Sequence, residues 1–335
     1  MASFSQFGND LYTGKRSYDI VGSRRIWWIV SSVLLLVVIV GTALHGGFAF
    51  GIEFRGGSQF QISDTKNLNQ TFAGNTVKAA VPSTSPVVTI VGSNSVRIQT
   101  DQLTTKQSVA VTDALAKAYN VKQTQVASSF IGATWGADIT RQAITGLVAF
   151  LVLVAIAMSL YFRTWKMSAA ALIALAHDLI ITAGVYGLLH IEITPAAVIG
   201  FLTILGYSLY DTVVVFDKIR ENTSEDGEQS RRTFGESVNL AVNQTLVRSI
   251  NTSVVAILPV AGILFIGALL LGAGTLQDIS LALFIGIIVS TYSTIFVAAP
   301  LYATFRSGED RIKKRDKRAL SVREASIATT SIATK

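Results

Sequence analysis

Six long apolar segments constrain this chain most strongly, because each one can cross a lipid bilayer as a helix. An α-helix rises 1.5 Å per residue, so about 20 apolar residues span the roughly 30 Å of hydrocarbon. Half of the residues are hydrophobic and only 15% are charged, which excludes an ordinary soluble protein. We therefore expect a polytopic α-helical membrane protein with six transmembrane helices, at residues 26–44, 139–162, 168–189, 194–216, 246–271 and 278–305.

The first apolar segment has a signal peptide as its competing interpretation. Its basic lead is long, however, and the run exceeds a usual signal-peptide core. Trp27 and Trp28 also have the character of an interfacial anchor. We therefore divide the chain into an N-terminal segment 1–25, a first transmembrane helix 26–46, a domain 47–138, helices 2–6 within 139–306, and a basic tail 307–335.

The segment between the first two spans has the pattern of a small α+β domain. Turn residues separate apolar runs at strand spacing from two helix-like runs. We expect Val109, Leu115 and Ala116 on the inner side of the second helix. The order β-α-β-β-α-β is that of a ferredoxin-like split unit. Its expected elements are strands at 54–62, 87–91, 95–100 and 121–130, and helices at 69–81 and 104–119.

The distribution of positive charge predicts the orientation in the membrane. If the N-terminus is cytoplasmic, the inward segments contain 20 of the 28 Lys and Arg residues. The short outer turns near 190–194 and 272–277 contain none. Positive charge resists translocation in short flanks, so we place both termini in the cytoplasm and the small domain outside. The basic tail is most simply an orientation signal and a contact for anionic lipid, with a ribosome or partner contact as the alternative.

The span at 194–216 contains an ionisable residue, Asp211, within apolar sequence. Such residues cost several kcal/mol, face a bundle interior or a wet cavity, and suggest a functional site by default. Tyr207 lies four residues earlier on the same helix face, with Ser208 beside it. A buried Asp that only hydrogen-bonds neighbouring helices is the alternative.

Other polar groups are expected in the same half of the bilayer. His177 and Asp178 lie about 15 Å from the cytoplasmic edge of their span at 1.5 Å per residue. A one-sided polar stripe opens the fifth span with Gln244, Arg248, Asn251 and Thr252. Asp178, Asp211 and Arg248 could then form a charge-compensated cluster, whereas Arg248 could instead extend its side chain to the interface.

A carboxylate that exchanges with a guanidinium in a dry bundle is a candidate proton switch. Protonation removes the ion pair and lets the helices repack. The chain has no cysteine, and its three histidines are scattered, so we expect no metal site and no cofactor other than protons as the coupling ion. The charge distribution also argues against nucleic acid as a partner despite a net charge of +7.

Three motifs resemble the SecF family, membrane subunits that assist the bacterial Sec protein translocase. They are GIEFRGGS after the first span, ALAHDLIITAGVYG in the third and IGFLTILGYSLYDTVVVFDKIREN in the fourth. The first contains Gly51, Glu53, Gly56 and Gly57. The resemblance covers nearly the whole chain and places it in the resistance-nodulation-division superfamily.

The resemblance implies a SecD partner and proton-driven help in late export through SecYEG, after the SecA ATPase has acted. It further implies a multi-pass protein of the bacterial plasma membrane that contacts YajC, YidC, membrane lipids and unfolded exported polypeptide. Asp211 matches the family's proton-pathway aspartate, Arg248 its span-5 arginine, and His177 with Asp178 its span-3 pair. Position 210 is Tyr where the family usually has Asn, which alters the surroundings of Asp211.

Three other functions compete with this interpretation. A proton-driven exporter of hydrophobic small molecules usually has twelve spans and two large outer domains in one chain. An intramembrane aspartyl protease would use Asp178 and Asp211, but the GxGD partner motif is absent, so we expect no enzyme activity. A non-catalytic translocase scaffold is compatible with every motif.

Overall fold

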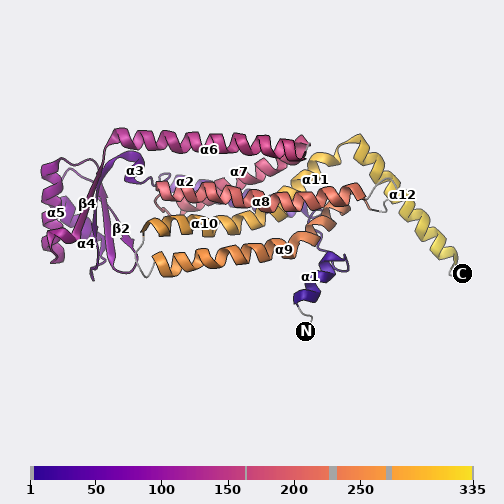
Figure 1. The fold of residues 1–335 in the computed structure, drawn as a ribbon, viewed down its shortest axis with the longest axis horizontal. Coiled ribbons are helices and arrows are strands. Elements are labelled where there is room, and N and C mark those ends of the chain that lie inside the picture. Colours follow the sequence, from indigo (N-terminus) through magenta and orange to yellow (C-terminus); the bar gives the residue numbers. More distant parts are fainter. Residues whose placement is uncertain (1–3, 163, 226–231, 269–273, 334–335) are drawn as a thin grey trace.

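The computed structural model describes residues 4–162, 164–225, 232–268 and 274–333. Within these ranges, six helices are long and apolar enough to cross a membrane, as the sequence predicts. They run side by side along the long axis of the molecule, with the small domain at one end (Figure 1). These helices are α2 (Arg24–Leu44), α6 (Ala133–Phe162), α7 (Trp165–Leu188), α8 (Pro195–Glu225), α9 (Phe234–Gly262) and α10 (Gly274–Ser293).

The helices extend beyond the predicted spans at several ends. Helix α9 begins at Phe234 rather than near Leu246, because Thr233 caps it: the Thr233 hydroxyl accepts from the backbone N–H of Glu236, and the Glu236 carboxylate accepts from that of Thr233. The last span was predicted at 278–305; it begins four residues earlier, at Gly274, contains a π-helical turn at Thr294–Ala298 and ends with α11 (Ala299–Ser307). Hydropathy alone does not locate such ends, since they are polar.

Helices α7, α8 and α10 form the interior of the bundle. In the most apolar 18-residue stretch of each helix, 56% of the residues are buried in α7, 44% in α8 and 50% in the span that begins with α10. The corresponding share in α6 is 11%. Small residues bring the backbones close together. A Cβ on Gly187 of α7 would lie 2.3 Å from the Thr42 hydroxyl of α2, and one on Gly286 of α10 would lie 2.5 Å from Ile204 of α8. Close packing of this kind is the main source of helix association in lipid.

The small domain contains a four-stranded antiparallel sheet in the spatial order β2-β3-β1-β4. Phe60 of β1 pairs with Ile98 of β3 on one side and Ser128 of β4 on the other. Two helices cover one sheet face, and the sheet lies between them and the bundle (Figure 1). The elements are β1 (Gly57–Ile62), α4 (Gln70–Ala80), β2 (Val87–Val91), β3 (Ser95–Thr100), α5 (Thr105–Tyr119) and β4 (Val126–Ile131).

Three sequence-based predictions for this domain are wrong in detail. The strand expected from Phe54 starts only at Gly57, because Ile52–Arg55 form a helical turn, α3, with glycines on both sides. The last strand starts at Val126 after a 3₁₀ turn. Val109 is 56% exposed, and the inner face of α5 contains Val111 in its place. A helix turns 100° per residue, so a shift of two positions moves a side chain to the opposite face.

The junction between the domain and the bundle combines backbone pairing with charge. Gly51 donates from its N–H to the Ile193 carbonyl at 2.9 Å, and Ile193 donates to the Ala49 carbonyl at 2.7 Å. Arg97 of β3 reaches across, with its Nη1 3.8 Å from Glu192 Oε2. The segment that enters the small domain and strand β3 are therefore both attached to the α7–α8 connection at the end of the bundle.

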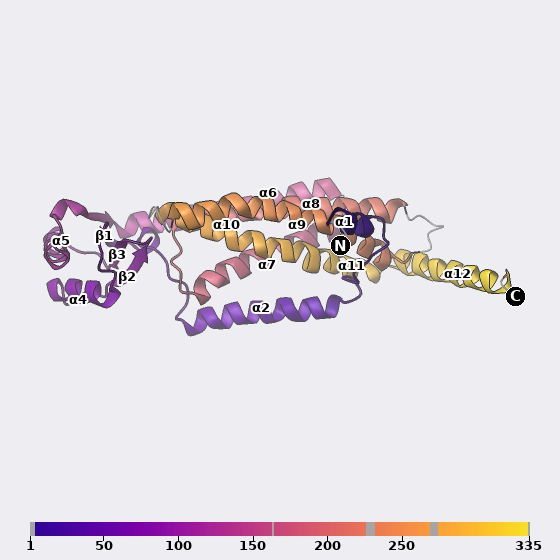
Figure 2. The same cartoon turned by 90° about the horizontal axis from the view of Figure 1, so that it is seen from below.

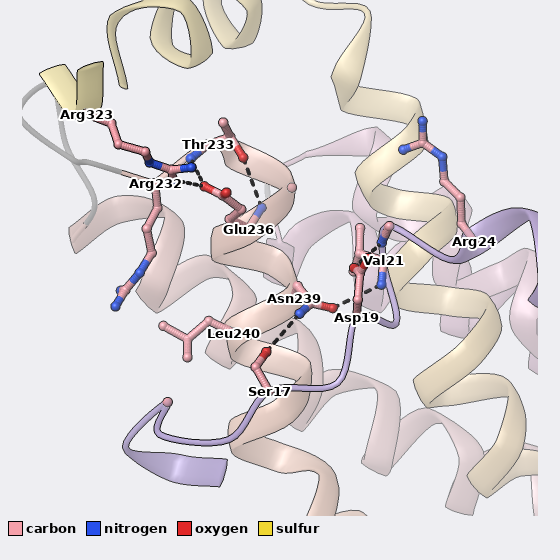
Figure 3. Close-up of a pocket in the computed structure, with 13 residues that line it drawn as sticks. Ser17, Asp19, Val21, Arg24, Arg232, Thr233, Glu236, Asn239, Leu240 and Arg323 are labelled. Carbon is pink, nitrogen blue, oxygen red and sulfur yellow. Dashed lines mark hydrogen bonds and ion pairs between the residues drawn. The ribbon is translucent and has the colours of Figure 1, made fainter. Parts of the chain in front are cut away.

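The first and last helices of the described chain, α1 (Phe4–Tyr12) and α12 (Asp310–Ala333), lie at the opposite end of the bundle (Figures 1 and 2). Asn239 Oδ1 of α9 accepts from the backbone N–H groups of Ile20 and Val21 in the N-terminal segment. Figure 3 shows Asn239 beside Val21 and Ser17 of this segment. In the same view, Arg323 of α12 lies 2.8 Å from Glu236. The N-terminal segment and α12 are thus both bound to the start of α9.

Candidate functional site

Asp211 of α8 is buried among the helices, with 3% of its surface exposed. Its Oδ1 accepts a hydrogen bond of 2.9 Å from the Ser249 hydroxyl of α9. Its Oδ2 has no hydrogen-bond partner among the described residues. An ionised carboxylate can accept about four hydrogen bonds. Proton uptake at this oxygen would therefore relieve much of the cost of burying the charge.

A second carboxylate, that of Asp178 in α7, is completely buried. It accepts a 2.6 Å hydrogen bond from the Ser208 hydroxyl of α8, and its other oxygen lies 3.3 Å from His177 Nδ1. His177 Nε2 has no partner among the described residues. Ser208 and Asp211 are three residues apart in α8, so the two carboxylates meet this helix about 4.5 Å apart along its axis.

Further hydroxyl groups connect α8 to α9 and α10. The Tyr207 hydroxyl donates to the Ser253 hydroxyl at 3.2 Å. The Ser253 hydroxyl in turn lies 2.6 Å from the Thr291 hydroxyl. One turn later the hydroxyls of Thr212 and Thr294 are 3.1 Å apart, where the π-helical turn begins. π-Helical turns inside α-helices often occur at functional sites. The polar network thus extends over α7, α8, α9 and α10.

Sequence reasoning identified the two carboxylates together with Tyr207 and Ser208. It did not identify Ser249 and Ser253 of the fifth span, which contact Asp211 and Tyr207. These two serines are four residues apart, so they share the face of α9 that meets α8. That spacing was the available signal, since serines are too common in spans to stand out singly.

The expected cluster of Asp178, Asp211 and Arg248 does not form within the described part of the chain. Arg248 is exposed, and neither carboxylate lies within ion-pair distance of it. Ser249 faces α8, so Arg248, 100° around the helix, points outward. Asn251 is exposed too, while Thr252 donates to the Arg248 carbonyl at 2.9 Å. Arg248 therefore belongs to an outer surface of α9 that continues with exposed apolar residues, Val255 and Leu258.

The glycine-rich loop motif is a structural junction rather than part of this network. Gly56 has φ +76° and Gly57 φ +148°, conformations that favour glycine. A Cβ on Gly57 would lie 2.4 Å from the Thr100 carbonyl. Gly51 is buried beside Glu53, whose Oε2 is buried without a hydrogen-bond partner among the described residues. These residues position the small domain on the bundle.

The polar network contains groups that can bind and release protons. Among the described residues, no group of three or more His, Asp or Glu side chains is placed to hold a metal ion. The network instead contains two buried carboxylates, a histidine and several hydroxyls that donate to them or to each other. Carboxylates and histidines in such a setting are typical of proton relays.

Comparison with known proteins gives one consistent result. The family described as "Protein export membrane protein SecD/SecF, C-terminal" matches residues 110–308. The protein translocase subunit SecF of Streptomyces coelicolor is 44% identical over 324 residues, covering 96% of this chain and 86% of its own. The SecF of Mycobacterium tuberculosis H37Rv is 42% identical over 330 residues, covering 95% and 74%.

Among solved structures, SecDF of Thermus thermophilus, described as a translocon-associated membrane protein, superposes with a TM-score of 0.77 at 28% identity. The match covers 87% of this chain and 39% of that one, so this chain spans about two fifths of the fused protein. These similarities and the six spans show that the chain belongs to the SecF family of multi-pass membrane proteins.

Proposed function

We propose that this chain is a SecF-type subunit that pairs with SecD in the bacterial plasma membrane and uses the proton-motive force in late protein export. Exported polypeptide would emerge through SecYEG after SecA has acted, and the subunit would help to draw it outward. Its relatives carry the name protein translocase subunit, which supports a role in protein translocation. The buried carboxylate of Asp211, with one oxygen unpartnered among the described residues, is the observation that carries the proton-driven part.

The outer surface of α9 supports pairing with a second membrane subunit. A charged side chain facing hydrocarbon is costly, and intramembrane charges normally face a bundle interior. Arg248 and Asn251 are exposed in this chain, and Tyr210 of α8 is 57% exposed. A neighbouring subunit would cover these groups. Relatives from Thermus thermophilus and Brucella abortus are named SecDF, and we propose that SecD is the subunit that covers this surface here.

The proposed proton step uses Asp211 and its hydrogen-bonding neighbours. Asp211 Oδ2 takes up a proton from water on one side of the membrane, which leaves a neutral carboxyl group. The longer-range attraction of the Asp211 charge for Arg248, which lies beyond ion-pair distance, is then lost, and α8 and α9 can shift against each other. Release of the proton to the other side restores the charge. Each charge that crosses 100 mV supplies about 2.3 kcal/mol, enough to bias a two-state change.

We further propose that the small domain is a ferredoxin-like unit outside the cytoplasm. Its helices and strands alternate as β-α-β-β-α-β, and the sheet order β2-β3-β1-β4 supports that topology. The excess of Lys and Arg at the other end of the bundle supports cytoplasmic termini. In this orientation the domain lies where exported polypeptide leaves the membrane.

Asp211→Asn tests the proposal, since it keeps the size of the side chain and removes only its titratable charge. We expect normal insertion and pairing with SecD but no gradient-dependent export of a precursor into inverted vesicles. Asp217→Asn is the matched control: Asp217 lies six residues further along α8 and accepts a 2.6 Å hydrogen bond from Tyr161 at an exposed position. Its export should remain nearly unchanged.

Arg248→Met should impair the same gradient-dependent step without loss of insertion. Export by the Asp211→Asn variant that still responds fully to a proton gradient would exclude Asp211 as the proton carrier. That result would favour a subunit that only holds the translocase together.

A further inference from the structure

A cavity of about 600 Å³ lies where the ends of α8 and α11 meet the start of α12. These helix ends lie at the end of the bundle opposite the small domain (Figure 1). Cationic side chains from three helices surround it, and none of the described lining residues is acidic. We name it the basic groove; its cations are Arg220, Arg306, Arg311, Lys314, Arg315 and Arg318.

Two of the arginines are fixed in place by other contacts. The Arg306 guanidinium lies 5.1 Å from the centre of the Phe234 ring and donates to the Tyr302 hydroxyl at 2.9 Å. Arg315 donates to the Thr223 carbonyl at 3.1 Å and to the Ser237 hydroxyl at 3.2 Å. These bonds connect α12 to α8 and α9, so the inner wall of the groove is preorganised rather than a loose tail.

Three of the other four cations are placed differently. Arg220, Arg311 and Lys314 have no carboxylate within ion-pair distance among the described residues. Arg311 and Lys314 are three residues apart on α12 and therefore share a face. Arg306 pairs with Glu309 at 3.2 Å, but these three cations repel each other, and a bound anion would reduce that repulsion.

The depth of the basic groove matches the level of lipid headgroups. Arg306 is the last residue but one of α11, which ends the sixth span. Arg220 follows the apolar part of α8 by only a few residues. Phe234 and Ile312 also line the cavity, which gives it an apolar side next to the cations. A phosphate carried on acyl chains is held at this level by the membrane itself.

We propose that the basic groove binds the phosphate group of an anionic membrane phospholipid. Arginine presents a planar fork of donors that matches phosphate oxygens, and basic pockets at the cytoplasmic ends of spans bind anionic headgroups. Bound lipid would join α8, α11 and α12 and so fix α12 against the bundle. This proposal does not depend on the proton-driven function.

The test is lipid binding to the full chain in detergent micelles, measured by native mass spectrometry during titration with phosphatidylglycerol or phosphatidylcholine. The wild-type protein should retain phosphatidylglycerol preferentially. Each cation near a membrane surface contributes about fivefold in affinity. Arg311→Gln/Lys314→Gln should therefore weaken phosphatidylglycerol binding by about tenfold or more. Arg220→Gln, on α8 rather than α12, should weaken it by about fivefold.

Lys313→Gln/Lys317→Gln is the matched control, because it removes two charges from the same helix at positions that do not line the cavity. It should weaken binding by less than about threefold, as expected for screened charges outside a binding site. Equal losses from the two double variants, or no loss with Arg220→Gln, would overturn the proposal in favour of unspecific attraction to the tail.

Two further arms identify the source of the phosphate. Inorganic pyrophosphate should bind much more weakly than phosphatidylglycerol, since it lacks the acyl chains. Equal affinity for pyrophosphate would show that the ligand is a soluble phosphate compound. A short RNA hairpin could bind more tightly than the lipid and lose this binding in the Arg311→Gln/Lys314→Gln variant. That result would show that the groove is a nucleic-acid contact. Either result would overturn the lipid assignment.

Discussion

Replacing Glu192 by Gln tests how the small domain is held against the bundle. Glu192 lies in the α7–α8 connection, and its carboxylate is 3.8 Å from Arg97 of β3. At an effective dielectric constant of about 20, an ion pair at this distance gains about 4 kcal/mol. The desolvation of two largely buried ions costs several kcal/mol each. The attraction and the cost are of similar size, so burial and the neighbouring charges together decide whether Glu192 is ionised in the folded protein.

Those neighbours disfavour the ionised form of Glu192. Burial raises the pKa of the Glu192 carboxyl above its ordinary value, and the hydrogen bond with Gln99 and the charge of Arg97 only partly offset the rise. Glu53 of α3 and Asp278 of α10 add to it by repulsion. His190 and Arg55 line the same cavity. The folded junction therefore favours a protonated Glu192 more than the opened junction does.

The sign of the pH dependence follows from this direction. A group whose pKa is raised in the folded state contributes stability that is fully present below the unfolded pKa, here near 4.5, and is lost as the pH rises through the folded pKa. The junction should therefore open more easily as the pH rises above about 4.5. Each unit of pKa difference corresponds to about 1.4 kcal/mol, a tenfold change in the opening equilibrium.

The assay is hydrogen–deuterium exchange of the full chain in lipid nanodiscs, corrected for the intrinsic exchange rate. The amides of Gly51 and Ile193 report the junction directly, since both are hydrogen-bonded across it. Glu192→Gln should increase their protection at pH 7 and flatten its pH dependence. Arg97→Gln should lower protection at pH 7 by about tenfold or more, because buried carboxylates lose their compensating charge.

Glu221→Gln, at an exposed position at the other end of the bundle, is the control and should change neither value. A tenfold loss of junction protection in Glu192→Gln at pH 7 would refute the reasoning. It would mean that the ion pair with Arg97 outweighs burial and repulsion.

Three further predictions concern the fold. Gly57→Ala should destabilise the small domain by about 2 kcal/mol or more in denaturant unfolding of the full chain, because the new Cβ would lie 2.4 Å from the Thr100 carbonyl; an unchanged midpoint would contradict the close approach. Asn239→Ala should expose the N-terminal segment to limited proteolysis while the spans stay protected, since the Asn239 side chain accepts two backbone N–H bonds from that segment. Equal cleavage of the wild-type and variant segments would show that Asn239 does not hold the segment in place. Because the chain has no cysteine, single cysteines placed at Gln107 and Lys317 can be labelled without background; we expect label from outside the cell at the first only, and the reverse pattern would invert the topology.

The number of spans and the presence of Asp211 inside one of them could be predicted from the sequence for a simple physical reason. Hydrocarbon tolerates only long apolar helices with internally satisfied backbones, so length and hydropathy locate the spans. An Asp such as Asp211 in that setting is visible because charge is so costly there. The strands of the small domain were visible too, through turn residues and alternation. Ile52–Arg55 nevertheless form a helical turn between Gly51 and Gly56, and Gly56 adopts a positive φ just before the strand begins.

The partners of these residues depended on tertiary structure, since hydropathy and period do not say how far each helix is rotated. Asp211 and Asp178 could be placed at similar depth, but only helix packing decided that Ser249 and Ser208 are their hydrogen-bond partners. The same rotation placed Arg248 on the outside of α9, away from the cluster expected from depth alone. The basic groove arose similarly: a tail that contains many cations is evident in the sequence, but its connection to α8 and α9 depends on where the chain folds back.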